Sequence, residues 1–119
     1  MRSPYRGIET GQGTLRIKVT VAPRGALPHE VVIDVDDLAI EIRAGDRSFV
    51  LGTGAIDTLF VVERPPRCGF LTWFGVFARR RGRADHLVFE TNELCVARYV
   101  ERTLEDWLGL DTRPVRGEL

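Results

Sequence analysis

The residues that bind metals and carry nucleophilic chemistry are scarce in this sequence. Among its 119 residues there are two cysteines and two histidines. Structural zinc sites usually take their ligands in local pairs, so that one turn presents two of them at once. No two of the possible ligands lie close together in the sequence: Cys68, Cys95, His29 and His86. We therefore expect no metal ion and no cofactor.

A long apolar run and a signal peptide are also missing. No apolar stretch approaches the ~18 residues that a membrane-spanning helix needs, and the longest, Cys68 to Ala78, is interrupted by glycines. The first residues, Met-Arg-Ser-Pro-Tyr, are not followed by the apolar segment that is typical of a signal peptide. These features predict a soluble protein in a reducing, cytoplasmic setting.

The sequence has no net charge, because 17 basic residues balance 17 acidic residues. Without an overall positive field, we expect no nucleic-acid partner. The charges are nevertheless unevenly distributed. Residues 64–83 contain arginines and no acidic residue. Residues 84–111 contain seven acidic residues, against two arginines, Arg98 and Arg102. Such asymmetry occurs in binding faces and also in two differently charged solvated surfaces, and the sequence leaves both open.

The length of the chain fits a single domain, which can bury about two-thirds of its surface without disulfides or metals. Residues 1–13 contain several glycines and a proline with little periodicity, and they predict a flexible N-terminal tail. Residues 111–119 predict a C-terminal tail. The domain itself is expected to occupy residues 14–110.

Seven strands are predicted from the alternation of apolar and polar residues between turn-forming residues. They cover residues 14–21, 31–35, 38–42, 49–51, 58–63, 73–78 and 86–90. Ala44-Gly45-Asp46 is typical of a hairpin turn. Gly52-Thr53-Gly54 is expected to be a turn, not a phosphate-binding loop, because no Gly-Lys-Ser/Thr follows it. Pro65-Pro66 is expected to end the fifth strand, because proline has no N–H to donate.

The period changes towards the C-terminus, where apolar residues recur at helical spacing. One side of the predicted helix is apolar and the other is charged: Val96, Val100, Leu104, Trp107 and Leu108 against Arg98, Glu101, Arg102, Glu105 and Asp106. Thr91 or Asn92 is the expected N-cap, and Gly109 stands where a helix-ending glycine belongs. The fold class predicted from these elements is α+β, mostly β, with one C-terminal amphipathic helix.

This order of seven short strands and one helix resembles the pleckstrin-homology superfold, and residues 48–62 and 94–108 resemble its short bacterial members. The resemblance implies a bent antiparallel sheet, forming a partly open barrel that the helix caps at one end. It also implies phosphoinositide binding by basic residues of the first two strands. Lys18 and Arg24 are present, but the second strand carries Glu30 and Asp34, which argues against that ligand. A plain α+β sheet with one covering helix is the structural alternative.

The stretch from Cys68 to Arg83 carries most of the functional information. Its alternation makes both faces of the predicted strand apolar: Leu71, Trp73, Gly75 and Phe77 on one face, and Phe70, Thr72, Phe74 and Val76 on the other. Either the protein itself buries both faces, or one face docks onto another molecule. An apolar patch beside an arginine cluster suits a protein interface, and it also suits an anionic membrane surface.

The sequence therefore favours a non-catalytic binding module, an accessory subunit that docks onto a protein complex. The expected partner-binding residues are apolar anchors and arginines: Phe70, Leu71, Trp73, Phe74, Arg79, Arg80, Arg81 and Arg83. One alternative is a peripheral membrane adaptor that binds anionic lipid through the same stretch. A second alternative is a small thiol-dependent enzyme, in which Cys68 is the nucleophile and His86, beside Asp85, supplies the base.

Overall fold

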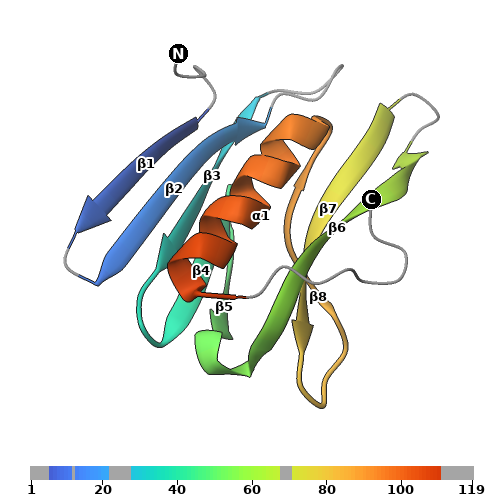
Figure 1. Cartoon of the computed structure of the whole chain (residues 1–119). Helices are drawn as coiled ribbons and strands as arrows, with labels where there is room; N and C mark the ends of the chain where they lie inside the picture. The colour runs from blue at the N-terminus through green and yellow to red at the C-terminus, as the bar shows by residue number, and fades with distance from the viewer. Residues whose placement is uncertain (1–5, 12, 22–27, 68–70, 111–119) are drawn as a thin grey trace. The chain divides into compact units, whose positions relative to one another are not determined.

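The structure is a computed structural model that describes residues 6–11, 13–21, 28–67 and 71–110. The described chain is mostly β-strand, its strands pair antiparallel, and an α-helix lies at its C-terminal end (Figure 1). The chain forms two compact units, Met1–Gly54 (unit 1) and Ala55–Leu119 (unit 2). The prediction of a mostly β chain with one C-terminal helix is confirmed. The predicted C-terminal tail, residues 111–119, lies outside the described residues.

Unit 1 contains a five-stranded antiparallel sheet in which each strand pairs with its neighbours in the sequence. Its strands are β1 (Arg6–Gly11), β2 (Thr14–Val21), β3 (His29–Val35), β4 (Ala39–Ala44) and β5 (Arg47–Gly52). The last four match the first four predicted strands. Gly45 occupies the β4–β5 turn with a φ of 63°, which confirms the predicted hairpin. Within the described residues β1 and β5 are the edges of this sheet, which does not close on itself.

Strand β1 corrects the prediction of a flexible tail over residues 1–13. Its backbone pairs with β2 from Arg6, opposite Val19, to Gly11, opposite Thr14. Gly13 lies in the connecting turn with a φ of 70°. The strand contains two glycines and shows little alternation, so side-chain periodicity does not indicate it. What holds it is backbone hydrogen bonding to a neighbouring strand, which the sequence pattern does not display.

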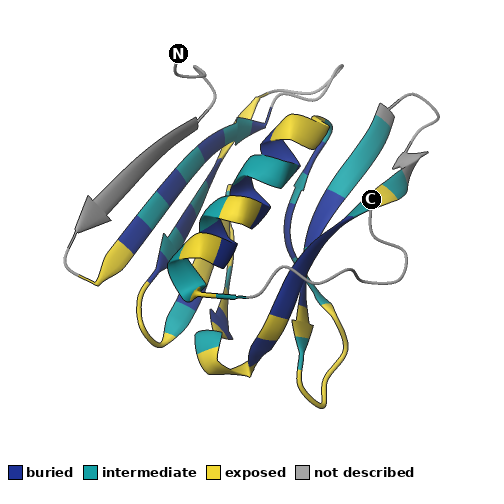
Figure 2. Ribbon diagram, in the orientation of Figure 1, coloured by how far each residue is buried: buried dark blue, intermediate teal, exposed yellow. Residues whose placement is uncertain are grey.

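Strands β2 to β4 bury alternate side chains, as a period of two predicts. The buried set consists of aliphatic residues that are at most 4% exposed: Leu15, Ile17, Val19, Val21, Val31, Ile33, Val35, Ile40 and Ile42. Figure 2 shows this alternation as bands of buried and less buried residues along the strands. Because fully burying one such side chain contributes about 1.5–3 kcal/mol, this face supplies much of the stability of unit 1.

The turn between β3 and β4 exposes a leucine that the alternating pattern assigns to a strand. Strand β4 begins at Ala39, and Leu38 is 80% exposed. The Asp36 carboxylate accepts hydrogen bonds from the backbone N–H groups of Leu38 and Ala39, both at 2.8 Å, and these bonds lower the pKa of Asp36. This turn, closed by an aspartate side chain, separates the two strands and leaves Leu38 outside the ladder.

Unit 2 contains a three-stranded antiparallel sheet and one α-helix. Following the short 3-10 helix η1 (Thr53–Ala55), its elements are β6 (Ile56–Arg67), β7 (Leu71–Arg80), β8 (His86–Thr91) and α1 (Leu94–Leu108). Strand β7 is the central strand, and α1 contacts all three strands. These elements match the last three predicted strands and the predicted helix.

Strand β6 continues through Pro65-Pro66, where the sequence predicts its end. It runs to Arg67, and its pairing with β7 is irregular between Arg64 and Arg67. Strand β6 lies at the edge of its sheet and pairs with β7 on one side. In an edge strand a proline, which lacks an N–H, therefore does not interrupt hydrogen bonding to a second strand. The irregularity also takes both prolines out of the regular ladder. The two prolines therefore distort the strand without ending it.

Helix α1 buries a wider face than its apolar stripe. Its predicted apolar residues are largely buried, but Glu101 and Glu105, which the sequence assigns to the charged face, are each only 5% exposed. Both lie in the same row of the helix as the buried Ala97, at intervals of four residues. The Arg98 guanidinium donates a hydrogen bond to Glu101 at 3.2 Å, which offsets part of the cost of burying that carboxylate.

The two ends of α1 differ in how well the sequence predicts them. Gly109 ends the helix in the left-handed conformation, with a φ of 68°, and its N–H donates to the carbonyl of Glu105, as predicted. The N-cap is Glu93, not Thr91 or Asn92, and its side chain makes no capping bond. The Thr91 hydroxyl instead accepts a hydrogen bond from the N–H of Glu93 at 3.2 Å.

Gly75 on β7 is a position where no larger side chain fits without movement. A Cβ there would lie 2.8 Å from Cε2 of Phe77 and 3.0 Å from Cδ1 of Leu87. We predict that Gly75→Ala lowers the free energy of unfolding, measured by urea denaturation, by about 1–3 kcal/mol, because overpacking forces these side chains from their preferred positions. The control is Gly54→Ala, whose Cβ meets nothing within 4 Å and which we expect to change stability by less than about 0.5 kcal/mol. Equal effects of the two substitutions would contradict the prediction.

Candidate functional site

One face of β7 forms part of the core of unit 2. Residues directly opposite each other on neighbouring antiparallel strands point to the same face. Val76 lies opposite Val61 on β6 and Phe89 on β8, and Ala78 lies opposite Leu59. All of these side chains are buried, and α1 contacts the three strands that carry them. This apolar face of the predicted aromatic strand is thus the one under the helix.

The other face of the sheet, turned away from α1, is called the outer face below. It carries the remaining alternate residues of the strands: Thr58, Phe60, Val62 and Arg64 on β6, Trp73, Gly75, Phe77 and Arg79 on β7, and Leu87 and Glu90 on β8. Phe60 and Phe77 stack there, with ring centroids 5.7 Å apart and an angle of 19° between the ring planes. Phe60 is 4% exposed and Phe77 is half-buried.

Two arginines cover these stacked rings. The guanidinium carbon of Arg79 lies 5.2 Å from the ring centre of Phe60, and that of Arg64 lies 5.8 Å from the ring centre of Phe77. Both distances fall within the range of about 6 Å over which a cation is attracted to a ring face. Arg64 is held in place by Glu90 through a hydrogen bond of 2.6 Å. The second apolar face of β7 therefore also has a cover within unit 2.

The two predicted apolar anchors whose side chains are described, Trp73 and Phe74, lie on different faces of the sheet. Phe70 lies outside the described residues, and of Leu71 the structure describes only its place at the start of β7. Trp73 and Phe74 are both half-buried, but Trp73 lies on the outer face and Phe74 on the side of α1. Of these two described anchors, Trp73 shares a face with Arg79 and Phe74 does not. A surface that includes the outer-face arginines can therefore use Trp73 and not Phe74.

Residues 79–85 comprise the end of β7 and the turn that leads to β8, and they contain the four predicted arginines. We refer to these residues as the arginine hairpin. Two of its arginines pair with carboxylates. Arg79 donates through Nε and Nη2 to the two carboxylate oxygens of Asp85, both at 3.3 Å. Arg81 donates through Nη2 to Asp57 on β6 at 3.4 Å. Both pairs lie at the surface, where ion pairs stabilise proteins by at most about 1 kcal/mol.

The other two arginines of the hairpin have no carboxylate partner among the described residues. Arg80 donates to the backbone carbonyl of Ala84, at 3.0 Å through Nη2 and at 3.3 Å through Nε. The side chain of Arg83 is exposed and has no hydrogen bond or ion pair within the described part of the chain. Gly82 forms the turn with a φ of 70°. The hairpin therefore presents positive charge that the described residues leave partly uncompensated.

The hairpin and Trp73 lie at opposite ends of β7. Trp73 is near the start of this strand and Arg80 is its last residue. At about 3.3 Å per residue, the two are separated by roughly 20 Å. A partner that touches both must therefore extend along the strand.

The residues proposed for thiol catalysis are only partly described. Cys68 lies outside the described residues, so its distance from His86 stays untested. Burial, together with the positive charge of Arg80, lowers the pKa of His86, which favours the neutral imidazole. Cys95 is a free, exposed thiol in the first turn of α1. Within the described ranges no cluster of three or more His, Cys, Asp or Glu residues could hold a metal ion.

The glycine pair at the end of β5 belongs to a turn, as the sequence predicts. Thr53 donates its backbone N–H to the carbonyl of Leu38 at 2.9 Å and its hydroxyl to the carbonyl of Asp37 at 2.8 Å. Residues Thr53–Ala55 form the short helix η1. Thr53 therefore fastens the end of β5 to the β3–β4 turn.

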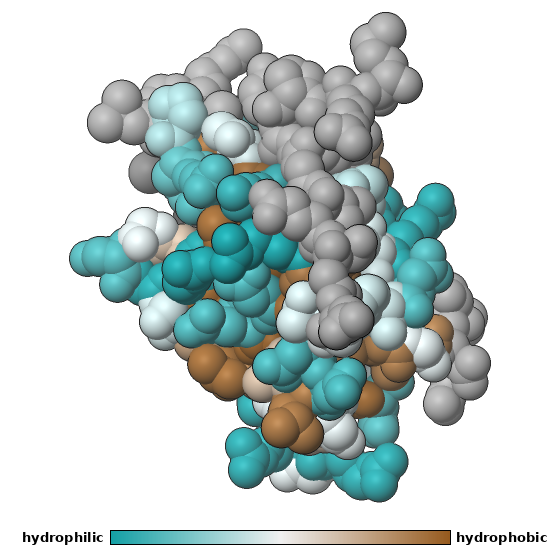
Figure 3. Space-filling view, turned by 90° about the vertical axis from the view of Figure 1, so that its left-hand side faces the viewer, coloured by the Kyte–Doolittle hydropathy of each residue, from teal (hydrophilic) through white to brown (hydrophobic). Residues whose placement is uncertain are grey.

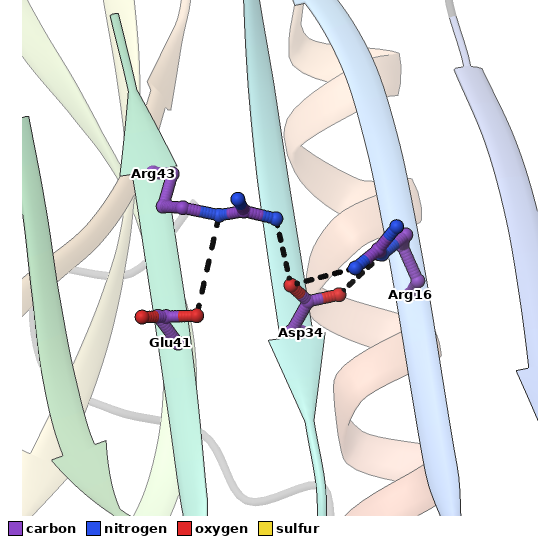
Figure 4. A network of polar contacts seen from close by, with 4 residues as sticks. All are labelled: Arg16, Asp34, Glu41 and Arg43. Carbon is purple, nitrogen blue, oxygen red and sulfur yellow. Dashed lines mark hydrogen bonds and ion pairs between the residues drawn. The ribbon is translucent and has the colours of Figure 1, made fainter. Parts of the chain in front are cut away.

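A charged network that sequence reasoning missed crosses β2, β3 and β4 (Figure 4). Asp34 accepts hydrogen bonds from Nε of Arg16 at 2.6 Å and from Nη2 of Arg43 at 3.0 Å, and Arg43 also lies 4.0 Å from Glu41. One signal for it is opposite charge at facing positions of adjacent strands, since Arg16 lies opposite Asp34. Arg43 lies opposite Val32 and reaches Asp34 diagonally across the β3–β4 pair. That signal becomes visible only once the register is known.

The network compensates its own charges, which indicates a structural role. The hydrogen bond from Arg16 is the main cause that lowers the pKa of Asp34, and the positive charges of Arg16 and Arg43 act in the same direction against the opposing effect of burial. Asp34 therefore remains ionised well into the acidic range. An aspartate shared by two arginines in this way has little capacity left for an external cation.

Comparison with known proteins gives no relative from which a function could be transferred: no family model, curated protein or solved structure matches the chain. None of the described helical residues form a helix long and apolar enough to cross a membrane. On the side of the molecule seen in Figure 3, the described residues are mostly hydrophilic, with hydrophobic residues in smaller patches between them.

We predict that Asp34→Asn destabilises the protein in a pH-dependent way. The folded-state pKa of Asp34 lies below its ordinary value of 3.8, so its ionised form stabilises the fold above that pH. This contribution is lost as the pH falls through the folded-state pKa. Because the two arginines are 42% and 47% exposed, water screens the pairs, and we expect a cost of only about 1 kcal/mol at neutral pH.

Urea denaturation from neutral pH down to acidic pH measures this difference. The gap in free energy of unfolding between wild type and Asp34→Asn should narrow as the pH falls below 3.8. The control is Glu41→Gln, because the contact of Glu41 with Arg43 is long, at 4.0 Å, and exposed; it should cost less than about 0.5 kcal/mol. A difference in free energy of unfolding that stays constant with pH would show that loss of the carboxylate charge does not cause the destabilisation.

Proposed function

We propose that this chain is a non-catalytic binding module, an accessory subunit that docks onto an acidic surface of a protein partner. The docking surface comprises the arginine hairpin and, further along β7, Trp73 on the outer face. The observation that carries the proposal is the concentration of four arginines in residues 79–83, two of which have no carboxylate partner among the described residues. Arginine is the basic residue that protein interfaces favour.

The exposure of these arginines supports the proposal. The Arg81 side chain is 84% exposed, and Arg83 beside it is exposed as well. Each guanidinium offers several N–H donors in one plane, which matches the two oxygens of a carboxylate. A partner that presents acidic side chains would therefore find donors in place without any rearrangement of the strands.

The composition of the outer face also supports the proposal. Trp73 is half-buried, so part of its ring is accessible, and tryptophan is among the residues that contribute most to interface affinity. Phe77, on the same face, is half-buried under Arg64. Protein interfaces typically have an apolar centre and a polar edge, and arginine is enriched in them. The outer face has apolar groups with arginines around them.

The order of the elements is consistent with the resemblance to the pleckstrin-homology superfold, which we retain as part of the proposal. Antiparallel strands that pair in sequence order are followed by a three-stranded sheet and then by one C-terminal helix. Such small β-rich modules commonly bind through loops and sheet edges. The proposed docking surface uses one hairpin and one sheet face of this kind.

An anionic membrane is the second candidate partner, because headgroups also attract exposed arginines. Membrane-binding loops usually add a large apolar side chain that enters the interface. The tip of the arginine hairpin offers only Gly82 and Ala84 between its charges, and Trp73 lies roughly 20 Å away along β7. This separation favours a protein surface over a lipid surface.

We predict that Arg83→Gln weakens the binding of a fluorescein-labelled, glutamate-rich peptide about two- to fivefold, because one exposed charge contact is lost. Fluorescence anisotropy at low salt measures the affinity. For the wild type, binding should weaken at physiological salt, since salt screens exposed charges. The control is Arg102→Gln, the same change at an exposed position of α1, which should leave the affinity unchanged.

Two outcomes would count against this function. Equal losses for Arg83→Gln and Arg102→Gln would mean that only net charge matters and that the hairpin is not the site. Salt-sensitive binding to phosphatidylserine vesicles, with no binding to the peptide, would replace the protein partner by a membrane. Trp73→Ala serves as a second probe of the same surface and should weaken binding to any folded partner that extends along β7.

A further inference from the structure

The two ion pairs of the arginine hairpin are longer than the Arg64–Glu90 and Arg16–Asp34 pairs. Arg79–Asp85 and Arg81–Asp57 have nitrogen–oxygen distances of 3.3 and 3.4 Å. The Arg64–Glu90 pair on the same outer face and the Arg16–Asp34 pair of unit 1 both measure 2.6 Å. Strong charge-assisted hydrogen bonds of this type usually measure about 2.7–2.9 Å. The two hairpin pairs are therefore held less tightly than these two pairs.

Exposure distinguishes the Arg81–Asp57 pair from the Arg64–Glu90 pair. The side chains of Arg81 and Asp57 are 84% and 45% exposed, whereas those of Arg64 and Glu90 are 35% and 15% exposed. Water competes for the charges of an exposed pair, so little free energy is lost when such a pair opens. An incoming anion can therefore replace Asp57 or Asp85 at small cost.

The guanidinium of Arg79 and the backbone of Arg81 are held by contacts other than those with the aspartates. The Arg79 guanidinium lies over the Phe60 ring at 5.2 Å, and Phe60 is itself buried by its stack with Phe77. The backbone N–H of Arg81 donates to the carbonyl of Ala55 at 3.1 Å. These contacts do not involve either carboxylate. The hairpin would therefore keep its shape when the carboxylates leave, which lowers the entropy cost of binding.

We propose that the arginine hairpin is a carboxylate-exchange site, in which Asp57 and Asp85 occupy Arg81 and Arg79 until acidic side chains of a partner replace them. This inference rests on the proposed function and adds the chemistry of the partner and the internal competitor. The ligand is an extended segment rich in glutamate or aspartate, which places neighbouring carboxylates on neighbouring arginines. The two aspartates lower the affinity for isolated anions and select for partners that present several carboxylates at once.

The geometry favours a carboxylate as the ligand. Nε and Nη2 of Arg79 face the two oxygens of Asp85 side by side, as parallel donors to a planar, two-oxygen acceptor. A glutamate or aspartate of the partner reproduces this arrangement directly. Arg80 and Arg83, which have no carboxylate partner among the described residues, supply the additional attraction that makes the exchange favourable.

The test compares variants that remove the internal competitors. We expect Asp57→Asn and Asp85→Asn each to tighten binding of the labelled glutamate-rich peptide about two- to fivefold, because one competing exposed pair is removed in each. The control is Glu63→Gln, an exposed acidic residue of β6 near the other end of the sheet. It changes the net charge by the same amount and should leave the affinity unchanged. Circular dichroism and thermal melting check that all variants stay folded.

A double-mutant cycle separates exchange from a general charge effect. If Asp57 competes for Arg81, the gain from Asp57→Asn should disappear when Arg81→Gln is also present. A gain that persists in the double variant, or an equal gain from Glu63→Gln, would overturn the exchange site while leaving the proposed function intact. Absence of peptide binding by the wild type and by both aspartate variants would overturn the proposed function together with this inference.

Discussion

A central strand with apolar side chains on both sides has to be covered twice, and the arrangement of unit 2 follows from this constraint. Helix α1 covers the face of β7 that carries Val76 and Ala78, both fully buried. No second helix covers the other side within the described part of unit 2. The Phe60–Phe77 stack and the arginines above it take that role. On the outer face, the aromatic rings therefore lie against the sheet, and the guanidinium groups form a second layer above the rings.

Arginine suits this second layer better than lysine would. Its guanidinium is planar and weakly hydrated, so it can lie flat on an aromatic ring while its N–H groups point sideways to acceptors. Arg64 does both at once, since it lies over Phe77 and donates to Glu90. A lysine ammonium would cover less of the ring and would keep more of its water. The use of arginine at nearly every basic position, with Lys18 as the exception, fits a surface in which cations also serve as packing groups.

The elements of the fold were predictable wherever local pattern decides them. Period-two alternation and turn residues predict the strands β2 to β8, and the helical period followed by Gly109 predicts where α1 ends. The failures occur where non-local pairing decides. Strand β1 depends on backbone bonds to β2, β6 tolerates Pro65-Pro66 because it is an edge strand, and Glu101 is buried because the covered arc of α1 is wider than its apolar stripe. For the candidate site, the sequence predicts the arginine cluster and places Trp73 and Phe74 on opposite faces of their strand, but only the register shows that Trp73 lies opposite Arg64.

The same residue type thus has two roles along the outer face, and the local environment decides between them. Near the middle of the sheet, Arg64 and Glu90 are partly shielded from water, so opening their pair would leave a poorly hydrated charge and the pair stays closed. At the hairpin, water reaches Arg81 and Asp57 freely, and the pair gains little from remaining closed. Arg79 lies between these limits, because Phe60 fixes its guanidinium while Asp85 remains exposed. Moving along the outer face from Arg64 to Arg81, the arginines change from packing groups that hold the sheet together to charges that are available to another molecule.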